Sequence, residues 1–120
     1  MSLKKRIKSF GYAFHGLFVL IWSEANAQIH FAATIIVIIA GFLLKISTIE
    51  WLFVLLNIGT VFSAEAFNTS IEKLCDKITL KKSKKVGLVK DLAASAVLIA
   101  SIIAFISGII IFVPKIIKLF

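Results

Sequence analysis

The sequence predicts an all-α protein that crosses a membrane three times, and three observations support this fold class. Hydrophobic residues make up 60% of the 120 residues, which is more apolar surface than a globule of this size can bury. Three apolar stretches approach the roughly 20 residues that a helix needs to span a bilayer. Fourteen basic residues against six acidic ones flank these stretches, a pattern that sets membrane topology. We therefore expect a lipid bilayer, and no nucleic acid, as the partner of this charge.

Each predicted element has its own signal, and together they are expected to form one domain. A helix rises ~1.5 Å per residue and the hydrocarbon core is ~30 Å thick. The predicted spans that follow from this length are residues 28–47, 49–70 and 91–113. Ser47 and Glu50 have the spacing of a capping box at the start of the second span. Pro114 is predicted to end the third helix, and the basic stretch 81–85 is predicted to be a flexible loop.

The first 25 residues allow two interpretations. A basic start, an apolar run and the small residues at 25–27 resemble a secretory signal peptide. Gly11 and Gly16 interrupt that run, however, and cleavage would remove Glu24, one of only six acids. We expect instead an amphipathic helix over residues 3–25 that lies on the cytoplasmic membrane surface. The mass of the intact protein distinguishes the two.

The basic residues predict the orientation of the chain. Eleven of the 14 precede the first span or lie between the second and third spans. The other three are Lys45, Lys115 and Lys118. Because cytoplasmic loops carry the excess of positive charge, we expect a bacterial inner-membrane protein with a cytoplasmic N-terminus and an external C-terminus.

One helical face carries most of the remaining acids. Glu65, Asn68, Glu72 and Asp76 are separated by three, four and four residues, which places them within about an 80° arc of a helix. A carboxylate within a span costs several kcal/mol unless it is paired or hydrated, so such residues are functional by default. We expect Glu65 just below the cytoplasmic headgroups and Asp76 in the cytosol. A lipid hydroxyl would meet Glu65, and a soluble ligand would meet Asp76.

These residue types suit phosphoryl transfer. Mg²⁺ is typically held by one or two carboxylates together with substrate phosphates, and Glu72 and Glu24 could supply them. Lys90, beside Asp91 at the start of the third span, could neutralise phosphate oxygens. A base, a metal clamp and a cation are the parts that this reaction needs. No G-x-x-x-x-G-K-[ST] loop is present, so a nucleotide would be held through its metal and by lysines.

A non-enzymatic alternative remains open at this stage. The same polar face could form an interhelical hydrogen-bond network for helix packing, or line a path for ions, without any turnover. The two histidines, His15 and His30, are interpreted as interfacial or packing residues without a role in the site. Labelled ATP offered with purified protein and a lipid alcohol would decide between the two classes.

Two motifs resemble signatures of the prokaryotic diacylglycerol kinase family. Residues 65–72, EAFNTSIE, followed by Asp76, resemble its E-x-x-N-[TS]-A-I-E-x-x-x-D signature. Residues 90–98, KDLAASAVL, resemble its second signature, K-D-x-A-[AS]-[GA]-A-V-L. The segment 11–16 and Glu24 match its N-terminal region. Ser70 and Ser95 replace smaller residues, and the similarity extends over nearly the whole chain.

The resemblance implies a homotrimeric lipid kinase that uses ATP and Mg²⁺, with each active site at a subunit interface. By matched position, Glu65 would be the general base on the lipid hydroxyl and Asn68 would help to position it. Glu24 and Glu72 would hold Mg²⁺ and ATP. The other residues predicted at the nucleotide are Tyr12, Asp76, Lys90 and Asp91.

The resemblance leaves two substrates open. Some members of the family phosphorylate diacylglycerol to phosphatidic acid, and others phosphorylate undecaprenol to undecaprenyl phosphate. Residues 49–51 and 109–115 look more like the undecaprenol kinase branch. Both lipids present a primary hydroxyl at the same depth, so the carboxylate face does not separate them.

Overall fold

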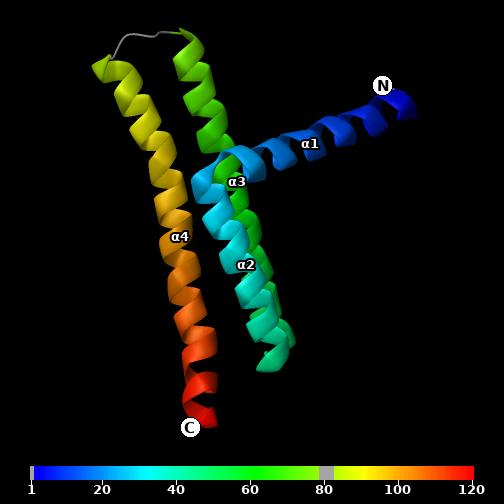
Figure 1. Ribbon diagram of the computed structural model, residues 1–120, viewed down its shortest axis with the longest axis vertical. Helices are drawn as coiled ribbons and strands as arrows, with labels where there is room; N and C mark the ends of the chain where they lie inside the picture. The colour runs from blue at the N-terminus through cyan, green and yellow to red at the C-terminus, as the bar shows by residue number, and fades with distance from the viewer. Residues whose placement is uncertain (1, 79–82) are drawn as a thin grey trace.

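All regular secondary structure among the described residues is α-helical. The computed structural model describes residues 2–78 and 83–120, and within these ranges it contains no strand. The four helices are α1 (Leu3–Ser23), α2 (Ala25–Leu43), α3 (Thr48–Ile78) and α4 (Lys84–Leu119). Figure 1 shows α2, α3 and α4 running along the long axis, while α1 leaves them almost at a right angle. Three helices, α2, α3 and α4, are long and apolar enough to cross a membrane, which confirms the predicted fold class.

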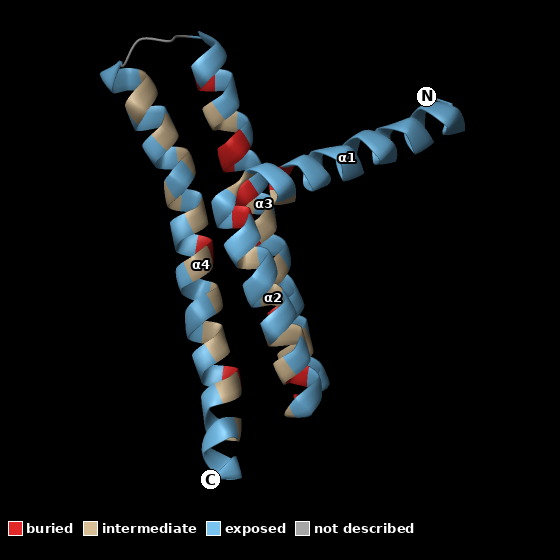
Figure 2. Cartoon of the chain, in the orientation of Figure 1, coloured by how far each residue is buried: buried red, intermediate tan, exposed pale blue. Residues whose placement is uncertain are grey.

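A sharp bend at Glu24 separates α1 from α2. Its backbone is extended, with φ −106° and ψ 120°, so the helical path is interrupted at this residue and resumes at Ala25. Gln28 donates from Nε2 to the carbonyl of Trp22 at 2.9 Å across the bend. On α1, the predicted apolar face that includes Ile7, Phe10 and Phe14 is exposed, and Figure 2 shows almost the whole helix uncovered. No described element covers that face, so it is available to lipid.

The turn between α2 and α3 has the predicted capping box. The backbone N–H of Ser47 donates to Glu50 Oε1 at 2.9 Å, and the N–H of Glu50 donates to Ser47 Oγ at 3.2 Å. The first span ends at Leu43 rather than at 47, because Lys45 adopts a left-handed conformation with φ 52° that terminates a helix.

Helices α3 and α4 are longer than predicted. They contain 31 and 36 residues, or about 46 and 54 Å at ~1.5 Å per residue, and so exceed the ~30 Å hydrocarbon core. Both helices are therefore longer than the hydrocarbon core alone requires. Of the predicted loop 81–85, residues 84 and 85 belong to α4, and residues 81 and 82 lie outside the described ranges.

The prediction that Pro114 ends the third helix is wrong, because α4 continues to Leu119. Proline removes one backbone donor, a loss that membrane helices can tolerate when neighbouring groups compensate. Packing on both sides of Pro114 supports the continuation. Ile111 is buried in a cluster with Ile46 and Val54, and Lys115 pairs with Glu50 of α3. The helix is thus fastened to α3 before and after the proline.

Most large apolar side chains of the described residues remain exposed in the isolated chain. Helix α4 packs chiefly against α3, and α2 packs on α3 as well. Buried residues form narrow lines where these helices meet, as Figure 2 shows. Extensive exposed apolar surface marks membrane or protein contact, in agreement with three spans in lipid.

Candidate active site

The polar face of α3 runs from a buried end to an exposed end. Glu65 retains 1% of its accessible surface and Asn68 retains 8%. Four residues farther along, Glu72 is half-buried, and Asp76 is exposed. The helical spacing predicted this common face, and the gradient in burial follows the predicted order. Glu65 is thus a buried carboxylate, and the more accessible polar groups lie farther along α3.

His30 of α2 is the basic residue in contact with Glu65, and the sequence interpretation gave it no role. Its Nε2 lies 3.2 Å from Glu65 Oε1, although within the described residues neither that oxygen nor Asn68 Oδ1 has a hydrogen-bond partner of acceptable geometry. A signal for this contact exists in the sequence. His30 is the only ionisable residue in the 19 residues of α2, so it is the natural partner for a buried carboxylate on a neighbouring span.

Two further carboxylates gather around Glu65. Glu24, at the bend between α1 and α2, and Glu72, on α3, are both close enough for their charges to interact with that of Glu65. Asn68 Nδ2 donates to Glu72 Oε1 at 3.5 Å. The structure therefore brings together four of the predicted site residues, from two separate parts of the chain.

The cluster fits a divalent cation that also binds phosphate. Three carboxylates in one region repel one another, and the single histidine beside them offsets only part of that repulsion. Within the described residues, no group of three potential metal ligands is close enough to hold an ion by itself. Mg²⁺ commonly takes only one or two carboxylates and completes its shell with waters and substrate phosphates, so Glu24 and Glu72 suit it.

Lys90 and Asp76 form a salt bridge between the two long helices. Lys90 Nζ lies 2.5 Å from Asp76 Oδ1. The hydrogen bond to Asp76 raises the pKa of Lys90 above its ordinary value, and the charge of nearby Glu72 acts in the same direction. Lys90 is therefore a fixed cation at the exposed end of the carboxylate face, where a phosphate group could approach.

Two predicted residues do not join the cluster in the single chain. Tyr12 is 74% exposed on α1, and twelve residues of helix place it about 18 Å from Glu24 along the axis. Asp91 is exposed at the start of α4 and forms no salt bridge with any residue in the described ranges.

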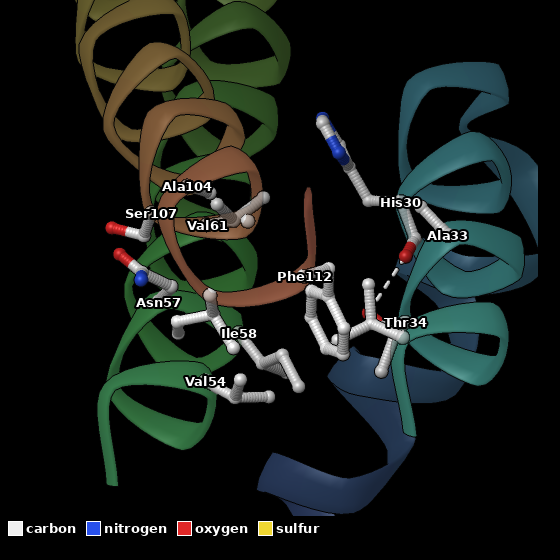
Figure 3. Close-up of a pocket in the computed structure, with 13 residues that line it drawn as sticks. His30, Ala33, Thr34, Val54, Asn57, Ile58, Val61, Ala104, Ser107 and Phe112 are labelled. Carbon is white, nitrogen blue, oxygen red and sulfur yellow. Dashed lines mark hydrogen bonds between the residues drawn. The ribbon is translucent and has the colours of Figure 1, made fainter. Parts of the chain in front are cut away.

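An apolar cavity of about 110 Å³ lies between α2, α3 and α4. Val54, Ile58 and Phe112 are among the side chains that line it, and His30 is at the opposite end from Val54 (Figure 3). The cavity therefore begins beside the partner of Glu65 and continues among apolar side chains. Its dimensions and lining suit part of a hydrocarbon chain.

The fold and the site define a helical integral membrane protein with a carboxylate cluster at one end of its bundle. Residues 11–112 match the family model described as prokaryotic diacylglycerol kinase, and the chain belongs to that family. It is 42% identical over 114 residues to an undecaprenol kinase of Bacillus subtilis, covering 95% of this chain and 93% of the relative. It is 29% identical over 101 residues to a diacylglycerol kinase of Escherichia coli, covering 84% and 83%.

A third relative supports the same class. The chain is 33% identical over 113 residues to a diacylglycerol kinase of Synechocystis, covering 92% of this chain and 64% of the relative. The three relatives are all named as kinases of a lipid alcohol. The chain is therefore a lipid kinase of a bacterial membrane, and the non-enzymatic alternative is set aside.

Proposed function

We propose that this lipid kinase transfers the γ-phosphoryl group of ATP, with Mg²⁺, to the hydroxyl of undecaprenol, and that diacylglycerol is the poorer acceptor. The observation that carries the proposal is Glu65, a 1% exposed carboxylate. Its Oε1 lies 3.2 Å from His30 Nε2 and accepts no hydrogen bond of acceptable geometry from the described residues. The preference for undecaprenol rests on 42% identity to an undecaprenol kinase against 29% to the Escherichia coli diacylglycerol kinase.

In the proposed reaction Glu65 is the general base. It takes the proton of the lipid hydroxyl as that oxygen bonds to the γ-phosphorus, while the bond from this phosphorus to the β–γ bridging oxygen breaks and ADP leaves. A positioned base contributes about 10²–10⁴-fold to such a step. Asn68 lies one helical turn beyond Glu65 and donates to Glu72, so we assign it the positioning of these groups.

The nucleotide would be held at the more exposed part of the face. Glu24 and Glu72 would bind Mg²⁺, which neutralises charge on the transferring phosphoryl group. Lys90 would contact phosphate oxygens while Asp76, its salt-bridge partner, keeps the ammonium in place. Asp91 and Tyr12 would complete the nucleotide contacts.

Two properties of the assembly belong to the proposal. We assign a homotrimer with active sites at subunit interfaces, since a neighbouring subunit could cover the exposed apolar surface of α3 and α4. We also assign the bacterial inner membrane, with the N-terminus and the site on the cytoplasmic side. The family match begins at residue 11 and so includes Glu24, which favours a retained α1 over a cleaved signal peptide.

The test is transfer of label from [γ-³²P]ATP to lipid by the purified protein in detergent, with undecaprenol and diacylglycerol in parallel. We expect label in both lipids and faster transfer to undecaprenol. Glu65→Gln should lower the rate by at least about 10²-fold while the protein elutes from size-exclusion chromatography as the wild type does. Absence of lipid label, or full activity of Glu65→Gln, would overturn the proposed reaction. Faster labelling of diacylglycerol would overturn the substrate preference.

A further inference from the structure

We propose that His30 is a positioning residue that holds the carboxylate of Glu65 in the orientation needed to accept the lipid proton. This inference rests on the proposed role of Glu65 as the base. The two side chains come from different helices, α2 and α3, and Nε2 of His30 lies 3.2 Å from Oε1 of Glu65. The Glu65 side chain is 2% exposed and the His30 side chain 24% exposed, so the contact is largely shielded from water.

The other charged groups near Glu65 do not provide this function. Glu24 and Glu72 carry the same charge as Glu65 and repel it. On α4, the cation Lys90 pairs with Asp76, about three helical turns beyond Glu65 on α3. Within residues 2–78 and 83–120, His30 is the only basic side chain in contact with a carboxylate oxygen of Glu65. The contact with one imidazole therefore opposes the repulsion from two carboxylates.

The position of His30 also suits a contact with the reacting end of a lipid. The residue lines the apolar cavity between α2, α3 and α4, and Figure 3 shows its ring at the opposite end from Val54. Its backbone carbonyl accepts a hydrogen bond of 2.7 Å from Thr34 Oγ1. His30 thus lies between the proposed base and the space available to a hydrocarbon chain, where a small rotation of Glu65 would move the base relative to the hydroxyl.

Loss of this contact should affect the chemical step more than nucleotide binding. Without His30, the charged groups that act on Glu65 among the described residues are Glu24 and Glu72, whose repulsion should turn its carboxylate away. Misplacement of a reacting group by about 1 Å can cost about 10²-fold in rate. Mg²⁺ and ATP, held in the proposal by Glu24, Glu72 and Lys90, should bind as before.

Steady-state kinetics of two His30 variants test the proposal. His30→Leu fills the space without a donor and should lower kcat about 10- to 100-fold with little change in the KM for ATP. His30→Gln retains an amide donor within reach of Glu65 and should recover most of that loss. His15→Gln, a change of the exposed histidine on α1, is the matched control and should keep wild-type kinetics. Unchanged kcat in His30→Leu, or equal loss in the glutamine and leucine variants, would overturn the inference.

A second measurement keeps the inference testable without any activity. The chain has two histidines, so His15→Gln leaves His30 as the only imidazole in a ¹⁵N-histidine NMR spectrum. Adding Glu65→Gln should move the Nε2 resonance of His30, whereas Glu50→Gln at the other end of the bundle should leave it in place. An unmoved resonance in the Glu65 variant would overturn the pairing. A wild-type protein that phosphorylates no lipid would overturn the proposed function instead, while this spectrum still reports on the contact.

Discussion

Lys115 near the end of α4 donates a hydrogen bond of 2.8 Å from Nζ to Oε2 of Glu50, in the first turn of α3. The other carboxylate oxygen of Glu50 accepts the backbone N–H of Ser47 at 2.9 Å. One side chain therefore caps α3 and fastens α4 to it. This joint is at the opposite end of the bundle from the carboxylate cluster, so its function is structural.

Lys115→Met is expected to lower the thermal unfolding midpoint and to leave lipid phosphorylation unchanged at temperatures below it. The substitution keeps the apolar stem but leaves the half-buried Glu50 carboxylate without its cation, which is the costly way to break such a pair. Lys118→Met is the matched control, because Lys118 is exposed and forms no salt bridge with the part of the chain that the structure describes. Equal midpoints for the two variants would contradict the structural role of the pair.

Gly41→Ala should destabilise the contact between α2 and α3. A Cβ at Gly41 would lie 2.6 Å from Cη2 of Trp51, and the indole is already packed against Phe42 with ring centroids 4.9 Å apart. Overpacking of this kind costs about 1–3 kcal/mol. Unfolding in detergent with increasing denaturant should show a lower midpoint.

The control for this change is Gly59→Ala, in the interior of α3. Apart from its chain neighbours and the backbone of its own helix, no heavy atom lies within 4 Å of its added Cβ. The substitution should therefore gain the helix preference of alanine, about 0.5–1 kcal/mol. We expect Gly41→Ala to lower the unfolding midpoint and Gly59→Ala to raise it. A lower midpoint for both would show that general loss of glycine, and not the tryptophan contact, causes the effect.

Much of the fold follows from local sequence features. Apolar length predicted the three spans, and the spacing of Ser47 and Glu50 predicted the cap that starts α3. The helix end wrongly predicted at Pro114 is explained by tertiary contacts. Local chemistry favours a helix end before a proline, but packing of Ile111 and pairing of Lys115 with α3 hold the helix together beyond it.

The part of the candidate site on α3 could be predicted as a shared face, whereas for Glu24 and Lys90 the sequence predicted a role but not the contacts. The three- and four-residue spacing that joins Glu65 to Asp76 depends on helical geometry alone, so the shared face could be predicted. The contacts of His30 with Glu65 and of Lys90 with Asp76 depend on the register of two helices against each other. No periodicity in the sequence encodes that register, and a lone histidine in a span is more commonly a packing residue.

Glu24→Gln and Glu72→Gln should each raise the Mg²⁺ concentration required for half-maximal lipid phosphorylation. Each change removes one proposed ligand oxygen with its charge and keeps the shape of the side chain. A titration of Mg²⁺ at saturating lipid, with free metal and ATP controlled separately, measures the shift. Glu50→Gln is the control, because this acid pairs with Lys115 and has no proposed metal role. An unchanged Mg²⁺ requirement in both site variants would remove these two residues from the metal site.

The predicted orientation can be tested by labelling single cysteines. Cys75 is the only cysteine and is buried, so Cys75→Ala provides a background for Ser2→Cys or Phe120→Cys. Three spans place the two termini on opposite sides of the membrane, and the basic residues place the first of them in the cytoplasm. In right-side-out vesicles, an impermeant maleimide should label position 120 directly and position 2 only after permeabilisation. Direct labelling of position 2 alone would invert the orientation. Direct labelling of both positions would require an even number of spans and would contradict three crossings.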